Sequence, residues 1–223
     1  MNYDWDFSPV WRGMDFLLGG LANTLLLSGA AILSGLVIGL LLAGLRIGAG
    51  GRVLGFAAAA VITFYRNTPP LVHLFFFFYG LPILIGVSLS PFLAALIALS
   101  IQSGAFFAEI FRGGITSIER GQWEAGRAIG MGEITLLRRV ILPQALRRML
   151  PPLTERCFEL IKTTALAASL AYGELLYRAM TLTSQSFRPL ETYTAVALLF
   201  FVVLCGSSFA IRALEARLAL AQP

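Results

Sequence analysis

Hydrophobic positions along this chain form long runs that short polar segments interrupt. Residues 16–45 and 192–211 contain no Asp, Glu, Lys or Arg. Each run exceeds the roughly 18 apolar residues that indicate a membrane-spanning helix. A third uncharged stretch, 67–108, is long enough for the end of one helix, a turn and most of a second. The pattern predicts an all-α, polytopic membrane protein.

We expect five spanning helices, separated by glycine and proline residues. Gly48, Gly50 and Gly51 break the first pair, and Pro82 and Pro91 separate the second helix from the third. The fourth helix is the least apolar, because charged side chains crowd its first half. The expected helices cover about 17–45, 53–79, 92–112, 153–173 and 192–211.

The distribution of arginine predicts the orientation of the chain. With five spans and a periplasmic amino terminus, three arginines lie outside and eleven lie in the cytoplasm, as the positive-inside rule requires. The outer ones are Arg12, Arg178 and Arg188, and the inner ones are Arg46, Arg52, Arg112, Arg120, Arg127, Arg138, Arg139, Arg147, Arg148, Arg212 and Arg217. The carboxy terminus is then cytoplasmic.

Composition agrees with a chain that lies mostly in lipid. It is 57% hydrophobic and only 13% charged, against about 25% charged residues in a soluble domain. Residues 1–223 are therefore expected to form one transmembrane domain, whose largest cytoplasmic segment is a loop at about 113–151. Within that loop we expect short helices at about 122–130 and 134–149, with Pro143 bending the second.

Two interpretations of this loop are open from the residues alone. Its arginines suit a basic amphipathic helix on an anionic membrane surface. The segment "QWEAGRAIG" (122–130) has no cationic face, and its small residues and single exposed aromatic, Trp123, suit insertion into a protein groove.

Charged residues at membrane depth point to a pathway for a polar solute. Glu155, Glu159 and Lys162 fall on one face of the fourth helix, and Thr163 and Thr164 extend this polar stripe. The stripe offers both signs of charge, which suits a zwitterion such as an amino acid. The alternative is an internal ion pair between Glu159 and Lys162.

Arg66 lies about 20 Å along the second helix, at 1.5 Å per residue, and Pro69 and Pro70 follow it. Arg66 is expected either to bind a substrate carboxylate or to pair with a glutamate of the fourth helix. Glu109 and Arg112 are three residues apart and predict an ion pair near the cytoplasmic end of the third helix, with a gate as the alternative role.

Small residues recur at every fourth position of the first helix. They allow close approach of another helix, from the same subunit or from a second one. These residues are Ala31, Gly35, Gly39 and Ala43.

The loop also contains a spaced motif. Glu124-Ala125-Gly126, then Gly130, then Val140-Ile141-Leu142-Pro143 resembles the Glu-Ala-Ala, Gly, Ile-x-Leu-Pro loop of ABC-importer permeases. Gly126 and Val140 are the departures from it. Other segments resemble the polar amino-acid branch of that family, namely "FYRNTPPLVHLFFFFYGLP" (64–82), "GAFFAEIFRGGI" (104–115), "ILPQALRRMLPP" (141–152) and "KTTAL" (162–166).

This resemblance implies a five-span permease subunit of a polar amino-acid importer in the bacterial inner membrane. Its expected partners are two cytoplasmic ATP-binding subunits, a second permease that is identical or paralogous, and a periplasmic amino-acid-binding protein. ATP and Mg²⁺ would bind to the ATPase partner. The resemblance places the following residues at the ATPase contact or in its motif: Trp123, Glu124, Ala125, Gly126, Gly130 and Pro143.

The chain itself is not expected to be an enzyme. A phosphate-binding Walker loop needs Gly-Lys-Ser/Thr, and the only lysine, Lys162, follows Ile161. His73 is the only histidine, which leaves too few ligands for a zinc site. The alternative function is an ATP-independent channel or secondary transporter for a small polar solute.

Overall fold

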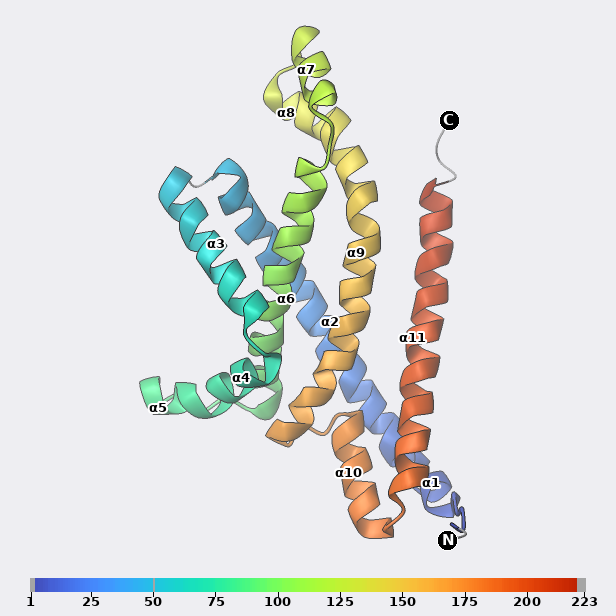
Figure 1. Ribbon diagram of the computed structural model, residues 1–223. Coiled ribbons are helices and arrows are strands. Elements are labelled where there is room, and N and C mark those ends of the chain that lie inside the picture. The colour runs from blue at the N-terminus through green and yellow to red at the C-terminus, as the bar shows by residue number, and fades with distance from the viewer. Residues whose placement is uncertain (1–2, 50, 220–223) are drawn as a thin grey trace. The chain divides into compact units, whose positions relative to one another are not determined.

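The computed structural model describes residues 3–49 and 51–219, and every regular element in these ranges is a helix (Figure 1). These residues group into two compact units. The first unit comprises Met1–Ala31, Pro70–Leu99 and Phe158–Pro223, and the second comprises Ile32–Pro69 and Ser100–Cys157. Each unit thus combines segments that lie far apart in the sequence.

Three of the described helical segments are long and apolar enough to cross a membrane. They are Met14–Ile47, Pro91–Thr116 and Pro189–Phe209. The first contains α2 (Met14–Gly44) and the start of a π-helical turn, η1 (Leu45–Ala49), the second is α6 (Pro91–Thr116), and the third belongs to α11 (Pro189–Ala219). The prediction of an all-α, multi-pass membrane protein is confirmed, whereas five spans and the orientation of the termini stay predictions.

The second expected helix is broken, so its prediction as one continuous helix is wrong. The helix α3 (Gly51–Asn67) ends before Pro69, and α4 (Pro70–Phe75), η2 (Phe76–Gly80) and α5 (Leu81–Ile85) continue at an angle of 106° to it. Two successive prolines supply no N–H group, and Pro69 disfavours helical backbone at Thr68. The carbonyl of Thr68 accepts a hydrogen bond from Gln102 Nε2 at 3.5 Å. If α3–α5 forms one bent span, the described residues contain four candidates.

The break expected between the loop and the fourth helix is absent. The helices α8 (Glu133–Leu136), η3 (Leu137–Ile141) and α9 (Leu142–Thr163) follow one another directly, and a 3₁₀ turn, η4 (Thr164–Leu170), ends the run. Pro151 and Pro152 lie inside α9 and each removes one N–H from its ladder. Burial of Ala145 and Met149 in the turns before them stabilises the helix against this loss.

The first unit contains two short helices that the sequence pattern did not predict. They are α1 (Ser8–Arg12) and α10 (Leu175–Ser186). Both contribute to a core with α2 and α11, which contains Val10, Leu17, Leu175, Ala179 and Val196.

In the second unit, α2 packs closely on α6 through glycine. A Cβ atom on Gly39 would lie 2.7 Å from Cβ of Phe107, and one on Gly104 would lie 2.8 Å from Cβ of Ile38. Gly35 similarly faces Ser103 and Phe107. This part of the small-residue stripe therefore packs within the chain.

Candidate functional site

The spaced motif of the loop forms a helix, α7 (Arg120–Ala128), whose end is fixed by Gly130. Figure 1 shows α7 and α8 beyond the ends of α6 and α9, at one end of the second unit. Gly130 has a φ of +78°, and its N–H donates to the Arg127 carbonyl at 2.9 Å. The Met131 N–H donates to the Gly126 carbonyl at 3.0 Å. These two bonds make a Schellman cap, which favours glycine for its left-handed residue, so Gly130 ends the helix.

The motif residues divide between two faces of α7. Glu124 and Ala125 are exposed. Gly126 is buried, and a Cβ atom there would lie 2.3 Å from Leu136 Cδ1. Trp123 is not the exposed aromatic that we expected, because it is half-buried and packs on the core cluster around Leu136.

Two isoleucines, and not Trp123, supply the exposed apolar surface of the hairpin formed by α7 and α8. Ile129 is 78% exposed and Ile134 is 73% exposed. Arg127 joins the two helices, since its Nε donates to Glu133 Oε1 at 2.8 Å, and this carboxylate raises the pKa of Arg127. The α7–α8 hairpin therefore exposes the Glu124 carboxylate, Ala125 and two isoleucines, and the Arg127–Glu133 pair holds its two helices together.

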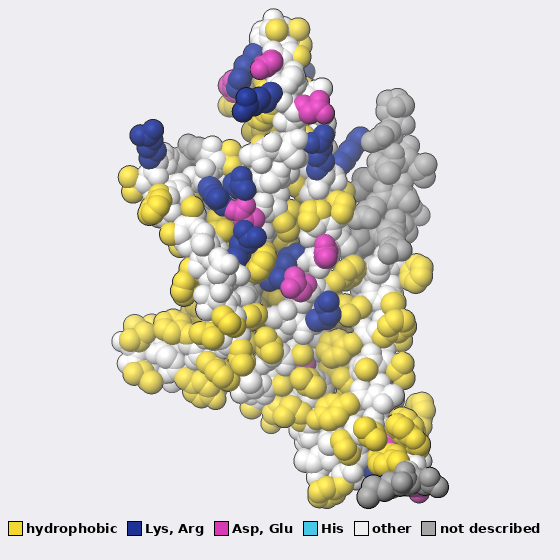
Figure 2. Space-filling view, in the orientation of Figure 1, with side chains coloured by type: hydrophobic (Ala, Val, Ile, Leu, Met, Phe, Trp, Pro, Cys, Tyr) yellow, Lys and Arg dark blue, Asp and Glu magenta, His cyan; other side chains and the backbone are white. Residues whose placement is uncertain are grey.

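Three charged residues of the predicted pathway share the exposed face of α9. Glu155, Glu159 and Lys162 are all exposed, and Figure 2 shows side chains of both charges along α9. Thr163 is half-buried, and its hydroxyl donates to the Glu159 carbonyl at 2.8 Å. Thr164 leaves the stripe, because it is fully buried and donates to the Ile161 carbonyl at 2.7 Å.

The same face of α9 continues toward the amino-terminal end of that helix. Arg148 and Pro152 precede Glu155 by seven and three residues, are exposed, and keep the spacing of one helical face. The stripe from Arg148 to Lys162 is about 21 Å long at 1.5 Å per residue.

Arg66 lies against an aromatic ring of the second unit. Its Cζ is 5.4 Å from the centroid of the Phe106 ring, and Cζ of the buried Arg156 is 3.7 Å from the same centroid. A ring face stabilises a nearby guanidinium group. The sequence offered no local signal for this arrangement, because Phe106 belongs to α6.

Glu109 accepts hydrogen bonds from two arginines. Arg112 donates to its Oε2 through Nε at 3.0 Å and Nη2 at 2.8 Å, and Arg46 donates to Oε1. The Glu109–Arg112 pair is the one that the spacing predicts. The sequence analysis missed Arg46, which joins the π-helical turn η1 to α6 across 63 residues of chain.

A cavity of about 410 Å³ in the second unit brings Arg66 and Glu109 together. It lies among α3, α6 and α9. Arg148 also lines it and donates from its guanidinium to the Ser117 carbonyl. The remaining lining residues are Phe106, Ile110, Gly113, Gly114, Ser117 and Pro152.

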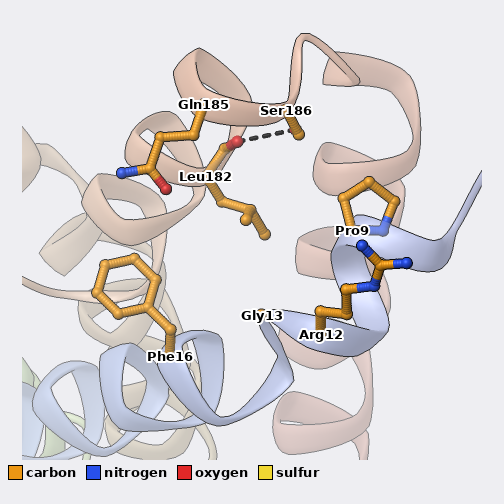
Figure 3. A pocket seen from close by; sticks show the side chains of 7 residues that line it. All are labelled: Pro9, Arg12, Gly13, Phe16, Leu182, Gln185 and Ser186. Carbon is orange, nitrogen blue, oxygen red and sulfur yellow. Dashed lines mark hydrogen bonds between the residues drawn. The ribbon is translucent and has the colours of Figure 1, made fainter.

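The first unit contains a second pocket, of about 500 Å³ (Figure 3). Arg12 and Phe16 face Leu182 and Gln185 of α10 across it. Arg12 is the one charged residue of its lining. A single cation without a second charged group defines no ligand, so this pocket adds nothing to the candidate site.

Burial of Glu174 is a further feature that the sequence analysis missed. This residue precedes α10, and its Oε1 accepts a hydrogen bond from the Tyr177 N–H at 2.6 Å. The side chain is fully buried, and burial raises the pKa of its carboxyl group. The sequence did offer a signal for the start of α10, because Glu174 directly follows Tyr172-Gly173 and precedes a helical segment.

We expect stability to depend on pH through Glu174. Because its folded pKa is raised, the unfolded chain ionises first, and stability falls as pH rises from the unfolded pKa toward the folded one. Glu174→Gln keeps an oxygen for the Tyr177 N–H and removes the titration. Its melting temperature should exceed that of the wild type at pH 8, by about 2–4 °C for each kcal/mol relieved, and the difference should close below about pH 4, where both states are protonated. Glu119→Gln, at an exposed carboxyl, is the control; equal pH profiles for all three proteins contradict the assignment.

The long apolar helices are those of a multi-pass membrane protein. The family model for binding-protein-dependent transport system inner membrane components matches residues 35–219. The chain belongs to this family. The prediction of a permease subunit of an ABC importer is thereby confirmed, and as in the other permease subunits, ATP hydrolysis is carried out by a partner.

Named relatives span nearly the whole chain. It is 38% identical over 219 residues to the glutamine transport system permease protein GlnP of Escherichia coli K12, covering 98% of this chain and 99% of the relative. It is 37% identical over 188 residues to the probable amino-acid ABC transporter permease protein YckA of Bacillus subtilis, covering 84% and 82%. A solved structure of an amino acid ABC transporter with histidines superposes with a TM-score of 0.91 at 30% identity, covering 96% of this chain and 100% of that one.

Proposed function

We propose that this chain is the transmembrane subunit of an ATP-driven importer for polar amino acids. The observation that carries the proposal is the exposed face of α9, where Glu155, Glu159 and Lys162 offer both signs of charge. Lipid disfavours such a face, whereas an aqueous path for a zwitterion requires it. The names of the relatives, which include glutamine and amino-acid transport, support the same substrate class.

The proposed complex lies in the bacterial inner membrane. The chain crosses it five times with a periplasmic amino terminus, and α9 is the crossing that lines the path. Two cytoplasmic subunits bind ATP and Mg²⁺, a second permease completes the membrane part, and a periplasmic protein delivers the amino acid. The excess of arginine on the cytoplasmic side supports this orientation.

The α7 helix couples the chain to the ATPase subunits. Glu124 and Ala125 are exposed for contact, and Gly130 sets the end of the inserted helix. Trp123 and Gly126 attach α7 to the core around Leu136, so a force on α7 reaches the permease helices. Pro143, at the start of α9, completes the motif where the hairpin joins that helix.

The substrate path uses the polar groups of α9 together with Arg66. Glu155, Glu159 and Lys162 face the solute, and Thr163 supports the Glu159 turn through its hydrogen bond. Thr164 is buried and stabilises the end of α9 through its hydrogen bond to the Ile161 carbonyl. The Glu109–Arg112 pair, bridged to Arg46, acts as a gate on α6.

Reconstitution tests the proposal directly. Proteoliposomes containing the chain, a candidate ATPase and a binding protein should accumulate one or more labelled L-amino acids, with L-glutamine as the first probe. Uptake should require ATP and the ATPase subunit. Uptake by the chain alone would instead establish the channel or secondary transporter. The absence of ATP-driven uptake for all twenty amino acids would refute the importer function.

A further inference from the structure

The cavity among α3, α6 and α9 lies in an excess of positive charge. Arg66 and Arg148 line it, and its single carboxylate, Glu109, is already bridged by Arg46 and Arg112. Two guanidinium groups therefore line the cavity, and its one carboxylate is already paired with two others. This imbalance favours a ligand that brings a negative charge.

The rest of the lining strengthens that preference. Phe106, Ile110 and Pro152 are apolar, and charges attract more strongly beside such groups than in water. Guanidinium groups match the planar geometry of a carboxylate. A volume of about 410 Å³ accommodates a small molecule.

The register of α9 connects the cavity with the proposed substrate path. Arg148 and Pro152, which line the cavity, lie on the same exposed face of α9 as Glu155, within the second unit. Arg148 also bonds to the carbonyl of Ser117, three residues before α7 begins at Arg120. A ligand in the cavity would thus touch the segment that leads into the coupling helix.

We propose that this cavity is a cytoplasmic-side subsite that binds the α-carboxylate of the transported amino acid, and this inference rests on the proposed function. Arg66 and Arg148 bind the carboxylate. Glu109 accepts a hydrogen bond from the ammonium group through its one remaining lone pair on Oε1. Occupancy from the cytoplasm holds α6 and α9 together beside α7 and slows the next cycle, so the accumulated product inhibits its own import.

Uptake against a preloaded lumen tests this subsite. Proteoliposomes enclose ATP, the ATPase subunits and increasing concentrations of the unlabelled amino acid that the wild type imports, while labelled amino acid and binding protein are outside. We expect internal amino acid to inhibit the wild type. Arg148→Gln should raise the half-inhibitory internal concentration about tenfold, as expected for the loss of one charge-assisted hydrogen bond.

Two controls separate the subsite from general effects. Arg147→Gln removes the same charge from the neighbouring exposed position, which does not line the cavity. Internal amino acid should inhibit uptake by this variant as strongly as uptake by the wild type. The α-amide of the same amino acid, enclosed instead, should not inhibit, because it lacks the carboxylate. Identical curves for Arg147→Gln and Arg148→Gln, inhibition by the amide, or no inhibition of an active wild type would overturn the subsite alone. A wild type without ATP-driven uptake would overturn the importer and the subsite together.

Discussion

Replacing Glu124 by arginine is expected to lower ATP-driven uptake about 100-fold, the scale of placing an unmatched charge in a protein interface. Glu124 is exposed on α7, six residues before Gly130 of the Schellman cap. The substitution therefore leaves the packing of the hairpin intact and changes only what it presents to a partner. Co-purification with the ATPase subunit and amino-acid-stimulated ATP hydrolysis should be lost together.

A matched charge inversion at Glu119 controls for the total charge of the loop. Glu119 is also exposed but precedes α7 and lies outside the motif, so Glu119→Arg should retain association and coupled hydrolysis. If Glu124→Arg behaved in the same way, α7 would not be the coupling element. The loop would then be better described as a basic helix on the membrane surface.

The elements that the sequence predicts well are those with long local patterns. The uncharged runs at 16–45 and 192–211 correspond to α2 and α11. The cap at Gly130 has a positive φ, a conformation that favours glycine. Proline was a poorer guide. Pro69 and Pro70 break a helix, whereas Pro151 and Pro152 lie inside one, because packing of the flanking turns decides whether a lost hydrogen bond is tolerated.

The residue types of the candidate site and its one local pair were predictable, whereas its long-range contacts were not. Spacing of three residues indicates the Glu109–Arg112 pair, but Arg46 joins it from another element. The motif likewise places Trp123 and Glu124 on α7 without saying which face packs inward. Leu136, on the next helix, settles that, since it fills the space over Gly126. Long-range contacts of this kind leave no periodic trace in the sequence.

Substituting Gly39 by alanine is expected to destabilise the fold by about 2–3 kcal/mol, at the upper end of the range for overpacking. The added methyl group would lie 2.7 Å from Cβ of Phe107 and 3.1 Å from both the Ala108 nitrogen and the Gly104 carbonyl oxygen. None of these atoms is the end of a flexible side chain. The helices α2 and α6 must therefore separate, and their shared core around Phe107 loosens.

Gly44→Ala provides the matched comparison, because it adds the same methyl group to the same helix where no atom lies within 4 Å. Its stability should equal or exceed that of the wild type, since alanine favours helix over glycine by about 1 kcal/mol. Thermal unfolding of the purified chain in detergent micelles, at matched lipid content, measures both variants. Equal melting temperatures for Gly39→Ala and Gly44→Ala would show that α2 and α6 do not approach through Gly39. The small-residue stripe would then be available to a second subunit instead.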